Sequence, residues 1–482
     1  MRPVRGAMHE QLGDPSVPLD RARQQTLSDQ VAVRMREAIL SGRAQGGDAV
    51  PSSRALAGAL GVSRGVVVRA FEHLAGEGYL DVSQGSVARV AVVDRSASPR
   101  RRRSLPDSPT RASARIDLLP GFPSMTRLDE GAWRAAWRSA AARAVPSAET
   151  DDRGLLRLRE QIAEHVRHAR GVSCDASDVL VTAGTSEAIM LLTLAIRSLR
   201  PGDPAIAVED PGYPATRRAI VRFGGSAVGV PVDDDGMRVD LLEAIDPAPH
   251  AVVLTPSHQY PLGGRLPVSA RVAVLDWAER HDALVIEDDY DSEFRHGAPV
   301  LPALASLDRG ERVALVGSFS KVLTPWLRLG YILLPRRTML HEAIRRIRDD
   351  ATCPVPGIAQ EAIADLLESG AVRRHIAAAR RDYAHRRGLV IAALGGLPGT
   401  RLTGLDGGLH AVLTLESADA AARVRNRSRA AGVAVADLAD YTIDETHASP
   451  GLVIGYAAPT DTALAEGLAV LRAAVLAERG RE

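Results

Sequence analysis

The stretch GSFSKVLTPWLRLGY, residues 317–331, decides the fold and holds Lys321, the only lysine in a chain with 60 lysine and arginine residues. Arginine supplies all the others, and its guanidinium group stays protonated and forms no useful imine. A desolvated lysine can instead act as a neutral nucleophile at neutral pH. Ser318, Ser320 and Arg328 flank Lys321 with hydroxyls and a guanidinium, which can bind a phosphate. The stretch therefore predicts a site where an amine reaches an aldehyde next to a phosphate.

Short apolar runs separated by helical stretches surround this site and predict a sheet. Ligands in such sheets bind beyond the carboxyl ends of the strands, where Lys321 also lies. Because the strands are apolar throughout, we expect a mostly parallel sheet with both faces covered by helices. Helical runs and two weaker strands that follow predict a smaller C-terminal subdomain. The expected strands of the sheet are Val179–Thr182, Ala205–Val208, Ala251–Thr255, Ala283–Glu287, Val313–Gly317 and Gly330–Leu334; the later elements are Pro354–Ser369, Val372–Leu397, Leu409–Leu415 and Gly451–Ala457.

Two further groups of polar residues follow predicted strands. VLVTAGTSEAIMLL, residues 179–192, predicts a strand, a glycine turn and a helix start, so Thr185 and Ser186 offer a second anion cradle. IEDDYDSEF, residues 286–294, ends another strand with a carboxylate that can keep a ring nitrogen protonated and a phenol that can bind a ring hydroxyl. Asp289 and Asp291 could instead be helix caps. Together with Lys321, these groups favour a cofactor with a protonated ring.

The N-terminal part predicts a winged helix-turn-helix of α+β class. Residues 27–41 repeat apolar side chains at helical spacing and stop before a glycine. Ser52 and Ser53 precede a short second helix that ends at Gly61, and Ser63 caps a third helix that runs to about residue 76. Residues 79–93 contain a glycine between two apolar runs, as in a two-stranded wing.

Charge divides the chain in the same way. The residues through Arg115 contain 18 arginines against 11 acidic residues, whereas the whole chain carries a net charge of +1. This asymmetry favours nucleic acid as a partner of the N-terminal part. Residues 94–115 are rich in Ser, Pro and Arg without apolar periodicity, so we expect a linker between a domain at 20–93 and one at 116–482.

Composition excludes several classes of protein. No segment approaches the ~18 consecutive apolar residues of a membrane-spanning helix, and residues 1–25 lack the apolar core of a signal peptide. Cys174 and Cys353, the two cysteines, can form neither a disulfide framework nor an unaided zinc site. We therefore expect a cytoplasmic protein without a metal site or a membrane partner.

The segment PSSRALAGALGVSRGVVVRAFEHLAGEGYLDVSQGS, residues 51–86, resembles the GntR family of regulators. In that family the cap of the second helix holds phosphates, the third helix reads the major groove and the wing touches the neighbouring groove. The resemblance implies that operator DNA is contacted by Ser52, Ser53, Arg54, Ser63, Arg64 and Arg69.

Nearly the whole chain resembles the MocR subfamily of GntR regulators, in which a winged domain is fused to a fold-type I aminotransferase-like domain. The motifs VEDPGYP, TPSHQYPLGG, IEDDYDSEF and GSFSKVLTPWLRLGY occur in the expected order. The resemblance implies that Lys321 forms a Schiff base with pyridoxal 5′-phosphate, that Asp288 pairs with the pyridinium nitrogen and that Tyr290 binds the ring hydroxyl. It also implies that Tyr213 stacks on the ring and that the phosphate is held by Thr185, Ser186, Ser318, Ser320 and Arg328. Tyr260 lies where aminotransferases place an asparagine near the ring hydroxyl.

Two departures from the aminotransferase pattern favour a sensor over an enzyme. Residues 149–154 lack the tyrosine that reaches the neighbouring subunit's phosphate, with Glu149 in its place, and Val453 replaces the arginine that clamps a substrate carboxylate. An arginine from another segment, such as Arg217 or Arg265, could substitute for this clamp. We expect a homodimeric transcription regulator in which the winged domain of one chain packs on the other chain. Its effector is pyridoxal phosphate itself, as in control of vitamin B6 synthesis, or a small amino compound. The alternative is an aminotransferase with an attached DNA-binding domain.

Overall fold

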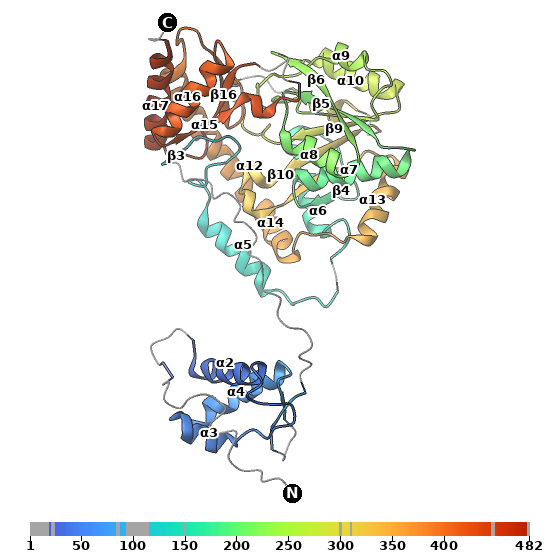
Figure 1. The fold of residues 1–482 in the computed structure, drawn as a ribbon. Coiled ribbons are helices and arrows are strands. Elements are labelled where there is room, and N and C mark those ends of the chain that lie inside the picture. The colour runs from blue at the N-terminus through green and yellow to red at the C-terminus, as the bar shows by residue number, and fades with distance from the viewer. Residues whose placement is uncertain are drawn as a thin grey trace. The chain divides into compact units, whose positions relative to one another are not determined.

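A computed structural model describes residues 19–20, 25–82, 87–92, 115–148, 150–297, 301–308, 311–444 and 449–479. The chain divides into two compact units, Met1–Arg111 and Ala112–Glu482, and each is described by itself (Figure 1). The predicted linker is almost entirely outside the described residues, as are Glu149 and the tip of the predicted wing. In the part of the chain that the structure describes, no helix has the length and apolar character needed to cross a membrane.

The N-terminal unit is a winged helix-turn-helix, as predicted. Thr26 caps α2 by accepting a hydrogen bond from the Asp29 amide, and Ser52 caps α3 through the Ala55 amide. Gly61 ends α3 with a φ of 63°, a left-handed conformation that suits glycine. The core between the helices is built from buried side chains such as Val31, Met35, Ile39, Val67 and Leu74. The elements are α2 (Leu27–Leu40), α3 (Ser53–Leu60), α4 (Arg64–Gly76) and the antiparallel pair β1 (Leu80–Asp81) and β2 (Arg89–Val90).

The second unit is built on an eight-stranded sheet of the predicted kind. Its order is β4-β11-β10-β9-β8-β5-β6-β7, with parallel pairing from β10 through β6. β11 is antiparallel to both β10 and β4, and β7 is antiparallel to β6. The strands are β4 (Val179–Thr182), β5 (Ala205–Asp210), β6 (Ser226–Asp233), β7 (Gly236–Met237), β8 (Ala251–Leu254), β9 (Leu284–Asp289), β10 (Val313–Ser318) and β11 (Gly330–Leu333).

Helices cover both faces of this sheet, because successive apolar side chains point to opposite faces. Ile206, Val253 and Ile286 pack into one core with helices α7 and α13, while Ala207 and Val252 pack into another with α10. The remaining apolar side chains near β4 join a third core with α6 and α14. The helices of this unit are α5 (Glu130–Ala142), α6 (Leu156–Arg170), α7 (Thr185–Leu199), α8 (Pro214–Arg222), α9 (Val239–Glu243), α10 (Val268–Arg280), α11 (Leu304–Leu307), α12 (Phe319–Val322), α13 (Thr338–Asp350) and α14 (Gly357–Glu368), with the 3-10 turn η1 (Pro325–Leu327).

The predicted C-terminal subdomain forms a second, smaller layer. Its four-stranded antiparallel sheet has the order β12-β13-β16-β15, and helices α15, α16 and α17 gather beside it (Figure 1). The segment at the start of the unit, β3, pairs in parallel with β14 and so joins this layer. The elements are β3 (Ile116–Asp117), α15 (Ala371–Leu394), β12 (Arg401–Thr403), β13 (His410–Thr414), α16 (Ala418–Ala430), β14 (Val433–Ala434), β15 (Ala436–Asp437), η2 (Leu438–Tyr441), β16 (Gly451–Gly455) and α17 (Asp461–Arg479).

Candidate functional site

The register of three strands brings the two predicted anion cradles together. Gly330 at the start of β11 pairs with Ser318 at the end of β10 and with Thr182 at the end of β4. Thr185 and Ser186 begin α7 directly after β4, while Ser320 and Lys321 follow β10. Both cradles therefore lie at one corner of the sheet, as the sequence predicts for ligands at strand ends.

Close backbone packing shapes this corner. A Cβ atom on Gly330 would lie 2.8 Å from the Gly317 carbonyl oxygen and 3.0 Å from the Gly184 Cα, so position 330 requires glycine. The Ser318 hydroxyl accepts a hydrogen bond from the Ser320 amide and lies 2.9 Å from the Ser320 hydroxyl. At the start of α7, no side chain caps the helix at Gly184. The positive end of α7 is thus open to an anion.

Lys321 is held at the same corner by the chain that precedes α5. Its ammonium group donates a hydrogen bond to the carbonyl oxygen of Gly121. Burial lowers the pKa of Lys321, while the charges of Asp291 and Asp288 oppose this shift. Since the net shift is downward, the Lys321 side chain is closer to the neutral amine than an exposed lysine would be.

Asp288 lies near the carboxyl end of β9, in a position that suits a cationic ring. The side chain is buried, and its Oδ1 atom has no hydrogen-bond partner among the described residues. Burial, followed by the negative charge of Asp289, raises the pKa of Asp288 to about 7. A protonated nitrogen placed against this carboxyl group would supply the missing donor and stabilise its charge.

The other acidic residues of the motif have separate structural partners. Glu287 accepts hydrogen bonds from the amides of Leu304 and Ala305. Asp289 forms a buried ion pair with Arg170, with 2.6 Å between Oδ2 and Nε. Asp291 lies 3.0 Å from the Nδ1 atom of His258. These contacts show that Asp289 and Asp291 anchor neighbouring segments; they are not helix caps.

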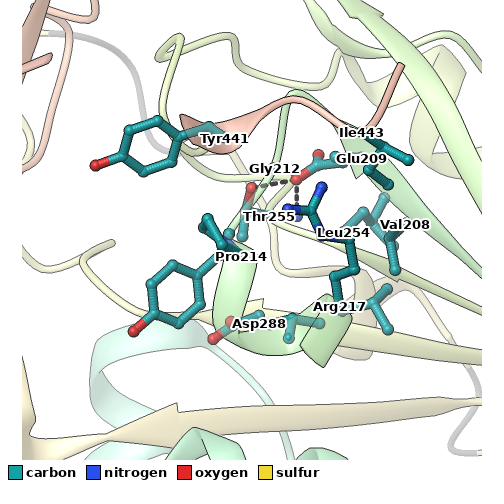
Figure 2. A pocket seen from close by; sticks show the side chains of 13 residues that line it. Val208, Glu209, Gly212, Pro214, Arg217, Leu254, Thr255, Asp288, Tyr441 and Ile443 are labelled. Carbon is teal, nitrogen blue, oxygen red and sulfur yellow. Dashed lines mark hydrogen bonds between the residues drawn. The ribbon is translucent and has the colours of Figure 1, made fainter. Parts of the chain in front are cut away.

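A pocket opens at the carboxyl ends of β5, β8 and β9, and two predicted site residues, Tyr213 and Asp288, line it. Glu209 lies beside them and accepts hydrogen bonds from the amide and hydroxyl of Thr255, as Figure 2 shows. Burial raises the pKa of Glu209 to about 7, so this carboxyl group is partly protonated at neutral pH. The remaining lining residues include Gly212, Pro214, Thr216, Arg217, Tyr441 and Ile443.

The segment Asp437–Asp444, called the strap below, closes one side of the pocket. Tyr441 and Ile443 project from it on the side opposite Asp288 (Figure 2). Both carboxylate oxygens of Asp210 accept hydrogen bonds from the strap, from the Ile443 amide at 2.7 Å and the Asp444 amide at 3.1 Å. The Gly212 amide donates to the Tyr441 carbonyl, and Arg217 donates to the Thr442 carbonyl. The strap thus ties the small subdomain to the large sheet.

An aromatic cluster lies behind the pocket. The rings of Tyr213 and Tyr290 each meet Tyr260 edge to face, at centroid distances of 5.6 and 5.5 Å. Tyr260 is itself buried, while Tyr213 is 45% exposed and free to present a ring face to a ligand. Val453 is fully buried in the same apolar cluster as Tyr260 and Tyr441.

The predicted DNA-contacting residues lie at the starts of α3 and α4 of the winged unit, except for Arg69, which lies further along α4. Ser52 caps α3, and Ser53 accepts a hydrogen bond from Arg64 Nε at 3.2 Å. Arg54 and Arg69 are exposed, as is Ser63, the residue before α4. The hydroxyl of Ser63 makes no capping hydrogen bond. This arrangement leaves cations and hydroxyls open to phosphates and base edges.

Sequence reasoning missed Glu209, Thr255, Tyr441 and the pairing of His258 with Asp291. Arg217, which the sequence offers as a substitute for the missing carboxylate clamp, does line the pocket. Glu209 and Thr255 are inside quoted motifs, and their position at the ends of two strands could have indicated them. Tyr441 belongs to a segment without any recognisable motif.

Comparisons with known proteins agree with this architecture. Residues 132–471 match the family described as aminotransferase class I and II, and residues 27–90 match the bacterial regulatory proteins of the gntR family. The chain is 39% identical to the HTH-type pyridoxine biosynthesis transcriptional regulator PdxR of Corynebacterium glutamicum, over 96% of this chain and 99% of that protein. It is 30% identical to the probable rhizopine catabolism regulatory protein MocR of Rhizobium meliloti, over 95% and 96% of the two chains. Among solved structures, an archaeal alanine:glyoxylate aminotransferase aligns with a TM-score of 0.69 and 25% identity, over 75% of this chain and 91% of that one.

Proposed function

The chain belongs to the MocR-type GntR transcriptional regulators, and from this we propose that binding of pyridoxal 5′-phosphate at Lys321 changes its affinity for operator DNA. The similarity to named transcription regulators over nearly the whole chain favours a regulator over an aminotransferase with an attached DNA-binding domain. We assign DNA binding to residues 20–93 and cofactor binding to residues 116–482, with residues 94–115 as the linker.

The observation that carries this proposal is that Lys321 and Asp288 both lie at strand ends and that their charges interact. Lys321 is the only side-chain amine of the chain, and its pKa responds to the charge of Asp288. Asp288 in turn has a buried oxygen atom without a partner among the described residues. An amine beside an unsatisfied carboxylate fits an aldehyde cofactor with a basic ring nitrogen.

Each residue has a distinct part in holding the cofactor. Pyridoxal phosphate, when bound, supplies an aldehyde that reacts with a neutral amine and a ring that withdraws electrons. Asp288 keeps a proton on the ring nitrogen, Tyr290 binds the ring hydroxyl and Tyr213 covers one ring face. Tyr260 supports both tyrosines from behind through its edge-to-face contacts. The phosphate is bound by Thr185, Ser186, Ser318, Ser320 and Arg328.

We assign the role of effector to the cofactor itself, in preference to an amino acid. A carboxylate-bearing effector needs a cation at its carboxylate, and position 453 offers a buried valine among apolar side chains. Arg217 lines the pocket, but its guanidinium already donates a hydrogen bond to the Thr442 carbonyl of the strap. The similarity to a protein named for pyridoxine biosynthesis supports the same choice. Control of vitamin B6 synthesis is therefore the expected output.

A homodimer, with the winged domain of one chain packed on the other chain, completes the proposal. Trp326 lies five residues after Lys321 and is 94% exposed, which is unusual for so large an apolar side chain. Contact with a second copy would cover this ring. Light scattering of the full chain tests the dimer directly.

The proposed function is tested with full-length protein and an operator selected from a random double-stranded DNA library. Pyridoxal phosphate is titrated while the visible absorption band and the fluorescence anisotropy of the labelled operator are followed together. We expect one band and a change in operator affinity at the same cofactor concentration. Lys321→Arg, which keeps the positive charge, should lose both responses.

Two other results of this titration would change the proposal. A change in operator affinity only after γ-aminobutyrate or taurine is added would replace the cofactor by an amino compound as effector. The absence of a band in the unaltered protein would refute the assignment of Lys321.

A further inference from the structure

A buried histidine and aspartate lie directly behind the cofactor residues and have no part in the proposal so far. His258 Nδ1 is 2.9 Å from the Tyr290 hydroxyl oxygen and 3.0 Å from Asp291 Oδ2. The His258 and Asp291 side chains are each only 2% exposed, whereas Tyr290 is partly open. The pair therefore supports the phenol from the side away from solvent.

The backbone packs closely around this pair. Gly408 has a φ of +72°, and a Cβ atom there would lie 2.4 Å from Asp291 Oδ2 and 2.6 Å from His258 Cε1. Gly407 and the ring of His410, 5.4 Å from the His258 ring, close the same space. Because a side chain at position 408 would displace both groups, glycine at this position keeps the pair in place.

Charge links the pair to the reactive amine. Burial lowers the pKa of His258, but the charge and hydrogen bond of Asp291 outweigh it and leave the pKa raised. Asp291 is also the largest influence that favours the charged form of Lys321. An unpaired Asp291 would therefore hold Lys321 as an ammonium group, which cannot attack an aldehyde.

We propose that His258 is a positioning residue, which fixes the Tyr290 hydroxyl and offsets the charge of Asp291 so that Lys321 is available as a free amine. Several charged and titratable groups face this pair: Tyr290, Tyr260, Asp288 and Lys321 on the pocket side, and His410, His296, Tyr456 and Asp406 on the other side. His410 cannot take the place of His258 as the cation beside Asp291, because burial lowers the pKa of His410 to about 3. This inference rests on the proposed function and deepens it. Its test needs neither cofactor nor DNA, so the inference and the proposed function can fail independently.

The single lysine makes the test direct. The full-length chain without added cofactor is treated with limiting acetic anhydride between about pH 6 and pH 10, and acylation of Lys321 is followed by mass spectrometry against the amino terminus as internal reference. His258→Gln removes the imidazole that pairs with Asp291 and should slow acylation of Lys321 at about pH 8 by about tenfold, which corresponds to one pKa unit. Asp291→Asn removes the negative charge, so Lys321 in this variant should be acylated no more slowly than Lys321 in the unaltered chain.

The double variant separates charge from packing. If His258 acts through Asp291, the variant His258→Gln with Asp291→Asn should recover the acylation rate to within about twofold of Asp291→Asn alone. Thermal unfolding checks that each variant is folded. Unaltered acylation in His258→Gln, or a double variant as slow as His258→Gln, would overturn the inference. Should His258→Gln not fold, slower acylation in Asp291→Asn would overturn it equally.

Discussion

Asp288 and Asp289 are adjacent in the chain, and the same substitution at each should change stability in opposite directions. Burial raises the pKa of Asp288 from 3.8 to about 7, so the folded chain holds a proton that the unfolded chain releases. The stabilisation from this proton is complete below about pH 4 and is lost as the pH rises through about 7. At ~1.4 kcal/mol per pKa unit, ionised Asp288 costs about 4 kcal/mol of folding free energy above neutral pH. Asp288→Asn removes this cost.

Asp289→Asn is the matched control, because it removes the partner of a buried cation. Arg170 is 4% exposed at its side chain and would keep only the Ser257 hydroxyl at 2.7 Å and the more distant Glu287 at 3.7 Å. Loss of one partner from a buried ion pair costs roughly 3–5 kcal/mol. Burial raises the pKa of Asp289 to about 6, but the charge of Arg170 opposes this rise, so at about pH 8 the Asp289 carboxylate is ionised and paired with Arg170. The two substitutions should therefore differ in sign at that pH, because only Asp289→Asn leaves a buried cation without its partner.

Urea unfolding followed by tryptophan fluorescence measures both effects in the second unit alone, because all four tryptophans, Trp133, Trp137, Trp277 and Trp326, lie within it. Without cofactor, Asp288→Asn should gain stability at about pH 8, and this gain should shrink as the pH falls and vanish at about pH 4, where the unaltered chain binds the proton in both the folded and the unfolded state. A loss of stability at the higher pH, or an equal gain at both, would refute the reasoning. The same variant should bind pyridoxal phosphate more weakly, since its amide cannot balance a ring cation.

Two further predictions concern the winged unit and the strap. Arg64→Ala should weaken operator binding by roughly 1–3 kcal/mol, measured by anisotropy, without altering the cofactor band; Arg36→Ala, whose arginine already pairs with Glu77, is the matched control. Asp210→Ala removes two charge-assisted hydrogen bonds from the strap and should cost about 3–5 kcal/mol in the same urea assay. Hydrogen exchange at Ile443 and Asp444 should rise in that variant, and unchanged exchange there would contradict the assigned role of Asp210.

The strands that the sequence predicts correctly are the buried ones. β4 is predicted residue for residue, since Val179–Thr182 is an uninterrupted buried run. β6, Ser226–Asp233, contains serine, glycine and proline and is mostly half-buried, so it gives no apolar run to detect. The antiparallel direction of β11 depends on the short connection from β10 through α12 and η1, and not on any periodicity within the strand.

Some residues of the candidate site can be predicted from the sequence, and others cannot. Lys321 and Asp288 are predictable because their chemistry is unusual at the end of a strand. The roles of Asp289 and Asp291 are not, because their partners Arg170 and His258 come from other segments that only the fold brings near. Tyr441 lies more than 150 residues from Asp288 and enters the pocket through the strap. Contacts between distant segments leave no local pattern in a single sequence.

The single lysine also determines how many molecules of an aldehyde one chain can take up. Free pyridoxal phosphate condenses with any accessible neutral amine, and ordinary proteins present many lysines at their surfaces. Here the cationic surface consists of arginine, which offers charge without a reactive amine. Apart from the amino terminus, each chain has one place to react, so its saturation curve has a stoichiometry of one. A regulator with this property would take up cofactor at one lysine and would lose none of it to reactions with other lysine side chains.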